Sequence, residues 1–244
     1  MLRLAMATKS QRLANQIESD LRPLGTKRRA EGEKAYLKSE LEFLGVTKPE
    51  IRQVVRENVE PADLGGAELT ALAEALWSKP INERRSAAIL ALTDGEALLG
   101  RPDVALIERF IRDSETWAYV DPLATAVLAP IVERNPSLTR TLDRWSTDEN
   151  FWIRRTAMLA LLPALRRGDG DFDRFGGYAE SMLEEKEFFI RKAIGWVLRE
   201  TAKERPDLVY EWLLPRAPRA SGVTIREAVK YLSEAQREEI QAAR

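Results

Sequence analysis

The chain has 244 residues, of which 44% are hydrophobic and 32% charged, and this composition predicts a folded protein rather than a disordered one. Cysteine and histidine are both absent, which excludes disulfides, Cys/His zinc sites and catalytic histidines. A hard metal held only by carboxylates stays open but has no motif behind it, so we expect neither a metal nor a cofactor. The formal net charge of −1 gives no overall signal for nucleic acid, and the lack of a long apolar run predicts no membrane span. The N-terminus also lacks the apolar core of a secretion signal, so we expect a cytoplasmic protein.

Helices are expected throughout, because apolar residues recur at helical spacing and no convincing alternating strand is present. The first 34 residues hold eight basic and four acidic side chains. We expect residues 1–30 to form a basic helical extension, which is either a solvated cap or a DNA contact. Further along, Thr47, Pro49 and Glu50 predict a capping box that opens the next helix. Proline and glycine then break the chain at regular intervals, which predicts an array of helices of roughly 10–18 residues.

Four of the predicted helices share a local sequence pattern. They read ERRSAAILAL from Glu83, IRRTAMLALL from Ile153, IRKAIGWVLR from Ile190 and IREAVKYLSE from Ile225. The equivalent arginines are Arg84, Arg154, Arg191 and Arg226, which are 70, 37 and 35 residues apart. The first gap is two periods, so a helix without the arginine is predicted near residue 119. Such a period is typical of HEAT-like or TPR-like repeats, and no TPR consensus is visible. We therefore predict one all-α domain over residues 1–244, a HEAT-like helical-repeat solenoid (an α-α superhelix) with a concave face.

The repeated arginines allow two interpretations. They can line the concave surface as an electropositive groove, or they can form ion pairs with acidic residues of neighbouring repeats. On the groove interpretation, the DNA-binding residues are Trp152, Arg154, Arg191, Lys192 and Arg226.

Aromatic and charged residues also recur on single helix faces. Trp117 and Asp121 are four residues apart, although Asp121 before Pro122 is equally typical of a helix N-cap. Trp152 and Arg155 are three apart, and Lys192 takes the position of Arg155 one repeat later, with Trp196 a turn beyond it. Each tryptophan alone would fit a core, but their repetition on one face favours a site. The neighbouring Phe188, Phe189 and Ile190 are predicted core residues.

A carboxylate among aromatic and basic side chains suits the cleavage of a glycosidic bond. A carboxylate can stabilise an oxocarbenium-like transition state and position water, while aromatic faces stabilise cations. Arginine and lysine bind phosphates. The combination therefore indicates a nucleic-acid substrate.

These residues make the chain resemble the AlkD-type DNA alkylation repair family of HEAT-like-repeat DNA glycosylases. The resemblance runs from about Tyr36 to about Leu232 and is carried by KEFFIRKAIGWVLRE, by the WxxxD of Trp117 to Asp121, by FWIRR and by IREAVKYL. It departs from the family pattern at Thr116, Ala118 and Pro122, which surround Asp121.

The resemblance implies a monomeric glycosylase that excises cationic N3-alkyladenine and N7-alkylguanine from duplex DNA. It implies that Asp121 is the catalytic carboxylate and that Trp117 and Trp196 pack against the damaged nucleotide. Arg155 would contact a phosphate, and Tyr36 would lie beside the lesion. Two alternatives stay open, a DNA-binding relative without excision activity and a protein-interaction scaffold. A scaffold has no need for Trp117, Asp121, Arg155 and Trp196 together.

Overall fold

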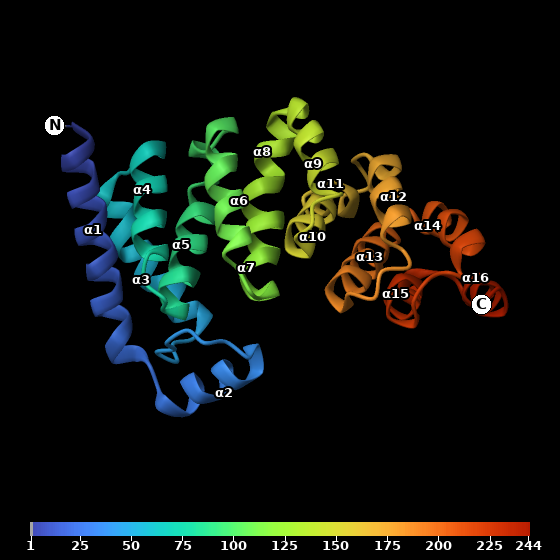
Figure 1. Ribbon diagram of the computed structural model, residues 1–244, viewed down its shortest axis with the longest axis horizontal. Helices are drawn as coiled ribbons and strands as arrows, with labels where there is room; N and C mark the ends of the chain where they lie inside the picture. The colour runs from blue at the N-terminus through green and yellow to red at the C-terminus, as the bar shows by residue number, and fades with distance from the viewer. Residues whose placement is uncertain (1) are drawn as a thin grey trace. The chain divides into compact units, whose positions relative to one another are not determined.

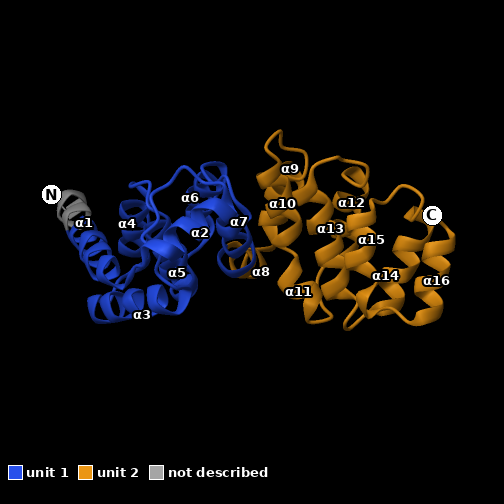
Figure 2. Ribbon diagram, turned by 90° about the horizontal axis from the view of Figure 1, so that it is seen from below, with its two compact units in different colours: residues 1–127 blue, residues 128–244 orange. Residues whose placement is uncertain are grey.

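The computed structural model describes the backbone of residues 2–244 and the side chains of residues 9–244. Over this range the regular structure is helical, with one isolated bridge between Glu42 and Ile81. The chain packs as two compact units, residues 1–127 and residues 128–244 (Figure 2). Each unit is described by itself, and the single domain predicted from the sequence stays a prediction.

The first unit is a two-layered array of helices (Figure 1). Helix α1 packs against α3 and α4, α4 packs against α5, and α5 also contacts α3 and α7. The helices are α1 (Leu2–Leu21), α2 (Lys27–Leu37), α3 (Lys48–Val59), α4 (Gly66–Trp77), α5 (Asn82–Asp94), α6 (Val104–Arg112) and α7 (Trp117–Pro122). A short π-helical segment, Leu123–Leu128, follows α7.

The second unit repeats this arrangement. Helix α13 is central, because it packs against α10, α11, α14 and α15, while α9 covers α10 and α16 covers α14. The helices are α8 (Ala129–Arg134), α9 (Thr139–Trp145), α10 (Phe151–Leu159), α11 (Leu162–Arg166), α12 (Phe172–Ser181), α13 (Phe188–Thr201), α14 (Pro206–Leu213), α15 (Gly222–Ala228) and α16 (Glu234–Ala242).

Each unit buries an apolar core between its helix layers. In the first unit the rings of Trp77 and Phe110 stack with centroids 4.2 Å apart, and Phe110 is 2% exposed. In the second unit Trp145 and Phe175 are fully buried. Burying aromatic and aliphatic side chains is the main favourable term in such a fold, because amphipathic helices pack their apolar faces against their neighbours.

Several local predictions are confirmed. Thr47 caps α3, since its hydroxyl accepts the N–H of Glu50 while the Glu50 carboxylate accepts the N–H of Thr47. The repeat position near residue 119 is helical, as the spacing predicts. The N-terminal segment is helical too, and α1 buries Ala14 and Ile17 completely. Helix α1 is therefore a packed part of the first unit rather than a solvated cap.

One glycine allows a close approach in the second unit. A Cβ at Gly195 of α13 would lie 2.7 Å from Cβ of Glu227 and 2.8 Å from the carbonyl oxygen of Thr224. Both of these residues belong to α15. The glycine before Trp196 thus permits α15 to pack directly on α13, which places charged side chains of the two helices within bonding distance.

Candidate functional site

Helix α7 carries Trp117 and Asp121. It begins at Trp117 because the Thr116 hydroxyl accepts the N–H of Ala118 at 3.2 Å and so caps the helix. Asp121 lies inside the helix four residues later, so the two side chains share a face, and both are partly exposed. The alternative role of Asp121 as an N-cap is wrong, because the helix continues through Pro122.

A break in regular α-helical bonding follows Asp121. Pro122 has no N–H to donate, and the next six residues, Leu123–Leu128, form a π-helical segment. Within it the hydroxyl of Thr125 donates to the carbonyl oxygen of Asp121 at 2.8 Å. Single π-helical turns are rare and occur frequently at functional sites. Pro122 departs from the family pattern. It is accommodated because the chain stays helical after it, with π-helical instead of α-helical bonding.

Tyr36 brings a second aromatic ring to Trp117. It lies near the end of α2 and is 73% exposed, yet the edge of one ring meets the face of the other, with centroids 6.4 Å apart and planes at 89°. Edge-to-face contact is a preferred geometry for aromatic pairs. The structure therefore brings together Tyr36, Trp117 and the helix that carries Asp121, all within the first unit.

The segment after Tyr36 is anchored by Glu83, a residue that no sequence motif marks as functional. This buried carboxylate accepts the N–H groups of Leu44, Gly45 and Val46 at 2.9, 2.8 and 3.3 Å. Gly45 has φ +80°, and a Cβ there would lie 2.2 Å from the carbonyl of Thr26. Glu83 stands directly before the repeated arginine in ERRSAAILAL, so its place in the repeat could be identified from the sequence. Its role could not, because its backbone partners are about 40 residues away in the chain.

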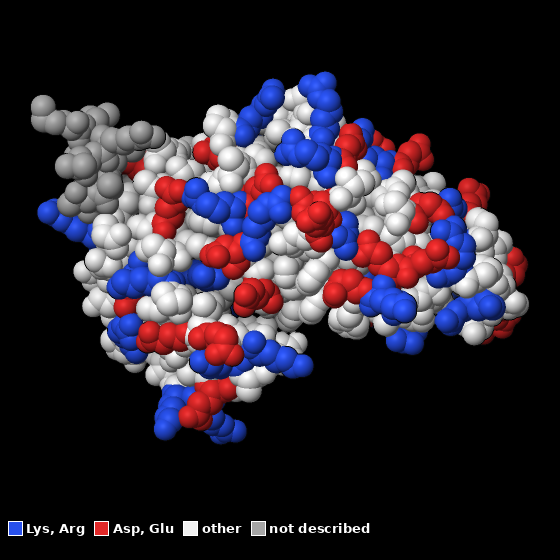
Figure 3. Space-filling view, in the orientation of Figure 1, with Lys and Arg blue, Asp and Glu red and all other residues white. Residues whose placement is uncertain are grey.

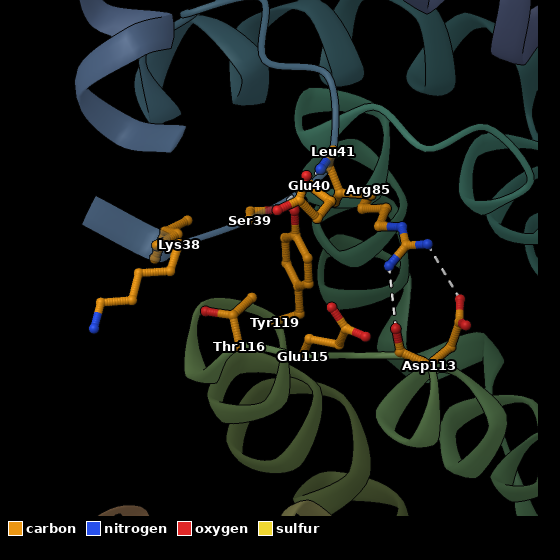
Figure 4. Close-up of a pocket in the computed structure, with 10 residues that line it drawn as sticks. Lys38, Ser39, Glu40, Leu41, Arg85, Asp113, Glu115, Thr116 and Tyr119 are labelled. Atoms are coloured by element: carbon orange, nitrogen blue, oxygen red, sulfur yellow. Dashed lines mark hydrogen bonds and ion pairs between the residues drawn. The ribbon is translucent and has the colours of Figure 1, made fainter. Parts of the chain in front are cut away.

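A small polar cavity of about 160 Å³ is lined by the residues that follow Tyr36 and precede Trp117 in the chain (Figure 4). Its walls come from residues 37–41 and from Arg85, Asp113, Glu115, Thr116 and Tyr119. Arg85 forms an ion pair with Asp113 at 3.2 Å, and the Tyr119 hydroxyl donates to Oδ1 of Asn82 at 2.7 Å. Burial raises the pKa of Tyr119 well above its usual range, so this hydroxyl stays protonated. These bonds tie the start of α7 and the residues before it to α5.

In the second unit, Arg155 and Trp196 lie together. Arg155 of α10 is only 2% exposed and donates a hydrogen bond to the carbonyl of Phe189. Its guanidinium carbon is 6.0 Å from the ring centroids of both Trp196 and Phe189, which is within cation–π range. Trp196 is partly exposed. A role for Arg155 at a phosphate stays a prediction.

The remaining predicted DNA-binding residues differ in their surroundings. Trp152 is 7% exposed and packs against Phe151 and Phe189, so its place in the set rests on the sequence alone. Lys192 pairs with Glu227 at 2.6 Å, while Arg226 is exposed.

The repeated arginines are not equivalent in their contacts. Arg84 is fully buried and pairs with Glu18 at 2.7 Å, and Arg154 pairs with Glu185 at 2.7 Å. Arg191 donates to the backbone carbonyl of Glu185 at 2.6 Å. The Arg84 pair joins α5 to α1, and the Arg154 pair joins α10 to the segment that precedes α13, so the ion-pair interpretation holds for Arg84 and Arg154. The groove interpretation stays a prediction for the others.

One core prediction is wrong. Ile190 is fully buried, but Phe188 is 52% exposed and Phe189 is intermediate. Phe188 is the first residue of α13 and lies one and two turns from Lys192 and Trp196, so helical geometry puts it on their exposed face. All three residues are apolar, which led to the prediction that all are buried. Only Ile190 lies on the face of α13 that packs against the core.

The charged groups form no cluster suited to a metal, since the described residues contain no group of three acidic side chains that could hold an ion. In the same part of the chain, no helix is both long enough and apolar enough to cross a membrane. Figure 3 shows basic and acidic side chains interleaved on one face of each unit rather than separated. Any basic surface must therefore be found from local contacts rather than from net charge.

Comparisons with known proteins agree with this fold. The sequence profile of a family described as "DNA alkylation repair enzyme" matches residues 17–232. A search of functionally curated proteins gave no match.

Three solved structures are similar. One, described as a predicted DNA alkylation repair enzyme from Enterococcus faecalis, has a TM-score of 0.77 and 24% identity over 86% of this chain and 97% of that one. AlkD2 from Streptococcus mutans has a TM-score of 0.59 and 16% identity over 77% and 91% of the two chains. The protein smu.31 from Streptococcus mutans UA159 has a TM-score of 0.58 and 17% identity over 76% and 92%. At these identities the likeness establishes the fold, and the predicted all-α, HEAT-like repeat class is confirmed.

Proposed function

The chain belongs to the DNA alkylation repair enzyme family, as its AlkD-type motifs predicted, and we propose that it is a monofunctional DNA glycosylase. Its role in the repair of alkylation damage follows from the family. The proposal concerns the reaction, which is hydrolysis of the N-glycosidic bond of N3-alkyladenine and N7-alkylguanine in duplex DNA by a monomer without a cofactor.

The observation that carries the proposal is the grouping of Tyr36, Trp117 and Asp121 in the first unit. Two aromatic rings meet edge to face, and a partly exposed carboxylate lies one helical turn from one of them. Aromatic faces attract cations, and a carboxylate stabilises a developing positive charge on the sugar. The alkylated base is cationic in the substrate, and the sugar becomes cationic in the transition state.

The reaction balances without a general acid. When the bond between C1′ and the base nitrogen breaks, the electron pair leaves with the base, which becomes neutral because it already carried a positive charge. The sugar becomes an oxocarbenium-like cation, water adds to C1′, and the water proton passes to Asp121 or to solvent. The products are the neutral alkylated base and an abasic site. A chain without histidine can run this chemistry, because nothing has to protonate the leaving group.

The second unit supplies groups suited to the DNA backbone. Trp196 presents part of its ring beside the Arg155 guanidinium, and we assign Trp196 to the sugar and backbone of the damaged nucleotide and Arg155 to a nearby phosphate. Arg191, Lys192 and Arg226 complete the proposed DNA contacts. Trp152 and Arg154 belong to the proposed DNA-binding set on the repeat pattern alone.

The test is release of N7-methylguanine from methylated duplex DNA. We expect Asp121→Asn to lower the single-turnover rate about a hundredfold, the usual scale for a carboxylate that positions water. Asp173→Asn, an exposed aspartate of α12, is the matched control and should keep the full rate. No release by the wild type would refute the glycosylase and favour a DNA-binding relative. Equal release by both variants would refute Asp121 as the catalytic carboxylate.

A further inference from the structure

Helix α5 begins with two buried polar residues that bond to different segments of the first unit. Asn82 is 7% exposed and Glu83 is fully buried. Asn82 accepts a hydrogen bond from the Tyr119 hydroxyl of α7 at 2.7 Å, and the Glu83 carboxylate accepts the N–H groups of residues 44–46 at 2.8–3.3 Å. Residues 44–46 lie in the connection between α2 and α3. The start of α5 therefore holds both α7 and the connection that follows α2.

Helix α2 depends on this connection for its place. None of its residues is buried, and in Figure 1 it lies below the two helix layers of the unit. Just before α2, the N–H of Thr26 donates to the carbonyl of Gly45 at 3.2 Å, and a Cβ at Gly45 would lie 2.2 Å from the carbonyl oxygen of Thr26. The other end of α2 leads into the same segment through residues 38–43. Both ends of α2 thus meet at residues 44–46, which Glu83 holds.

Backbone bonds of Glu42 reinforce this anchor. Its N–H donates to the carbonyl of Pro80 at 2.9 Å, and its carbonyl accepts the N–H of Asn82 at 2.9 Å. These bonds join the same connection to the residues that begin α5, and they do not involve the Glu83 side chain. Weakening the bonds of Glu83 therefore loosens residues 44–46 without releasing the whole connection, so a substitution there can be studied in a folded protein.

The two elements that α5 holds carry the ring pair of the candidate site. Tyr36 is the second-last residue of α2 and Trp117 is the first of α7, and their ring centroids are 6.4 Å apart. Tyr36 is 73% exposed, so little surrounding packing fixes its ring. The contact of two rings is a modest attraction, which by itself does not hold an exposed residue of a separate helix in place. The relative position of the rings therefore depends on the bonds at the start of α5.

We propose that Asn82 and Glu83 are positioning residues for base excision, which act by holding Tyr36 and Trp117 at a fixed separation. The inference rests on the proposed function in placing these two rings at the cationic base. Asn82 and Glu83 do not touch the substrate themselves, because both are buried. The loss of either bond would let one ring move relative to the other, and a misplacement of about 1 Å caused by a remote substitution can cost about 100-fold in rate.

The first test measures the separation of the two elements without any reaction. The chain has no cysteine, so Lys34→Cys in α2 and Glu115→Cys before α7 give two unique sites for nitroxide labels, both at exposed positions. Electron spin resonance then gives the distribution of distances between the labels. We expect a narrow distribution in this labelled parent and a broader one when Glu83→Gln is added. An unchanged distribution would overturn the proposal.

A second variant breaks the other bond with a smaller change. Tyr119→Phe removes one oxygen, and the ring keeps its contact with Trp77, whose centroid is 5.7 Å away. Because the ring itself is retained, the variant should fold, and it should also broaden the distribution of label distances. A distribution as narrow as that of the parent would overturn the assignment of Asn82.

The control lowers stability without touching either bond. Leu72 of α4 is fully buried, so Leu72→Ala should destabilise the first unit through a cavity while Asn82 and Glu83 keep their partners. Its label distances should match those of the parent, and its excision rate should match that of the wild type. Equal broadening in Leu72→Ala and Glu83→Gln means that lost stability alone moves the rings, and this outcome also overturns the proposal.

The second test asks whether Glu83 acts through Tyr36. With saturating enzyme, Glu83→Gln should lower the single-turnover rate of N7-methylguanine release about tenfold and leave the affinity for undamaged duplex DNA unchanged. In a Tyr36→Ala background the same substitution should lower the rate by less than about twofold, because no ring remains for Glu83 to position. An equal loss of rate in both backgrounds contradicts the inference.

The two tests separate this inference from the glycosylase. A wild type that releases no base refutes the proposed function, while the label distances still decide whether Asn82 and Glu83 hold the rings. Normal release by Glu83→Gln and Tyr119→Phe, with narrow distributions in both, refutes the inference and leaves the glycosylase standing.

Discussion

Arg84 is expected to be among the most important single residues for the stability of the first unit. It is fully buried, and its guanidinium donates to Oε2 of Glu18 at 2.7 Å and to three backbone carbonyls of α1 and α4. Arg84→Met keeps the approximate length of the side chain but removes the charge and every donor. Glu18 pairs with three cations in the wild type, and in the variant it would keep only Lys79 and Arg22.

The cost follows from what the substitution leaves behind. Removing one partner of a buried ion pair typically costs about 3–5 kcal/mol when the other charge is left uncompensated, and here Glu18 loses its only fully buried partner while keeping two partners that are about half exposed. The carbonyl oxygens that accept from Arg84 would also lose their donor. We therefore expect the free energy of unfolding of the first unit to fall by about 3–5 kcal/mol.

The assay is urea unfolding followed by circular dichroism and tryptophan fluorescence. Arg226→Met is the matched control, because Arg226 holds the equivalent repeat position but is exposed, and it should change the free energy by less than about 0.5 kcal/mol. A shift of the midpoint without a change of slope would show lost stability rather than a change in the unfolded state. A loss for Arg84→Met as small as that of the control would refute the reasoning.

Three further predictions concern other contacts. Glu83→Gln should cost about 1.5–3 kcal/mol and speed amide exchange over residues 44–46, whose N–H groups the carboxylate accepts. Glu227 has a pKa of about 2 against its ordinary 4.5, so its stabilisation is complete above pH 4.5 and is lost as the pH falls toward 2. Unfolding at pH 7 and pH 3 should therefore show a smaller pH dependence in Glu227→Gln. Phe188→Ala should leave thermal stability nearly unchanged, whereas Ile190→Ala should cost about 2–5 kcal/mol. Equal losses would contradict the exposure of Phe188.

Local sequence patterns were sufficient for the helices and their repeat. The capping box at Thr47 depends only on residues three apart, so it could be predicted from four letters and is confirmed. The period of about 36 residues likewise predicted a helix near residue 119 that lacks the arginine. The repeat register together with the family resemblance placed Trp196 in the groove; its side chain is partly exposed, and its role at DNA stays a prediction.

Other features depended on neighbours that are distant in the chain. The same arginine position is buried at Arg84, where α1 supplies Glu18 as its partner, and is exposed at Arg226 of α15. Phe188 has the composition of a core residue, but the phase of α13 against α10 and α15 turns it outward. The N-cap interpretation of Asp121 was wrong because the helix tolerates Pro122 through a π-helical segment.

The sequence by itself therefore determined the helical repeat, the family motifs and the candidates Trp117, Asp121 and Trp196. Tertiary structure decided which charges are held together. Glu83 anchors a loop about 40 residues away, and Glu227 gathers cations from two helices because Gly195 allows α15 to approach α13. Helical periodicity depends on residues that are close in the chain, so it can be predicted from the sequence. The partner of a buried charge is set by how helices pack, so only the folded protein reveals it.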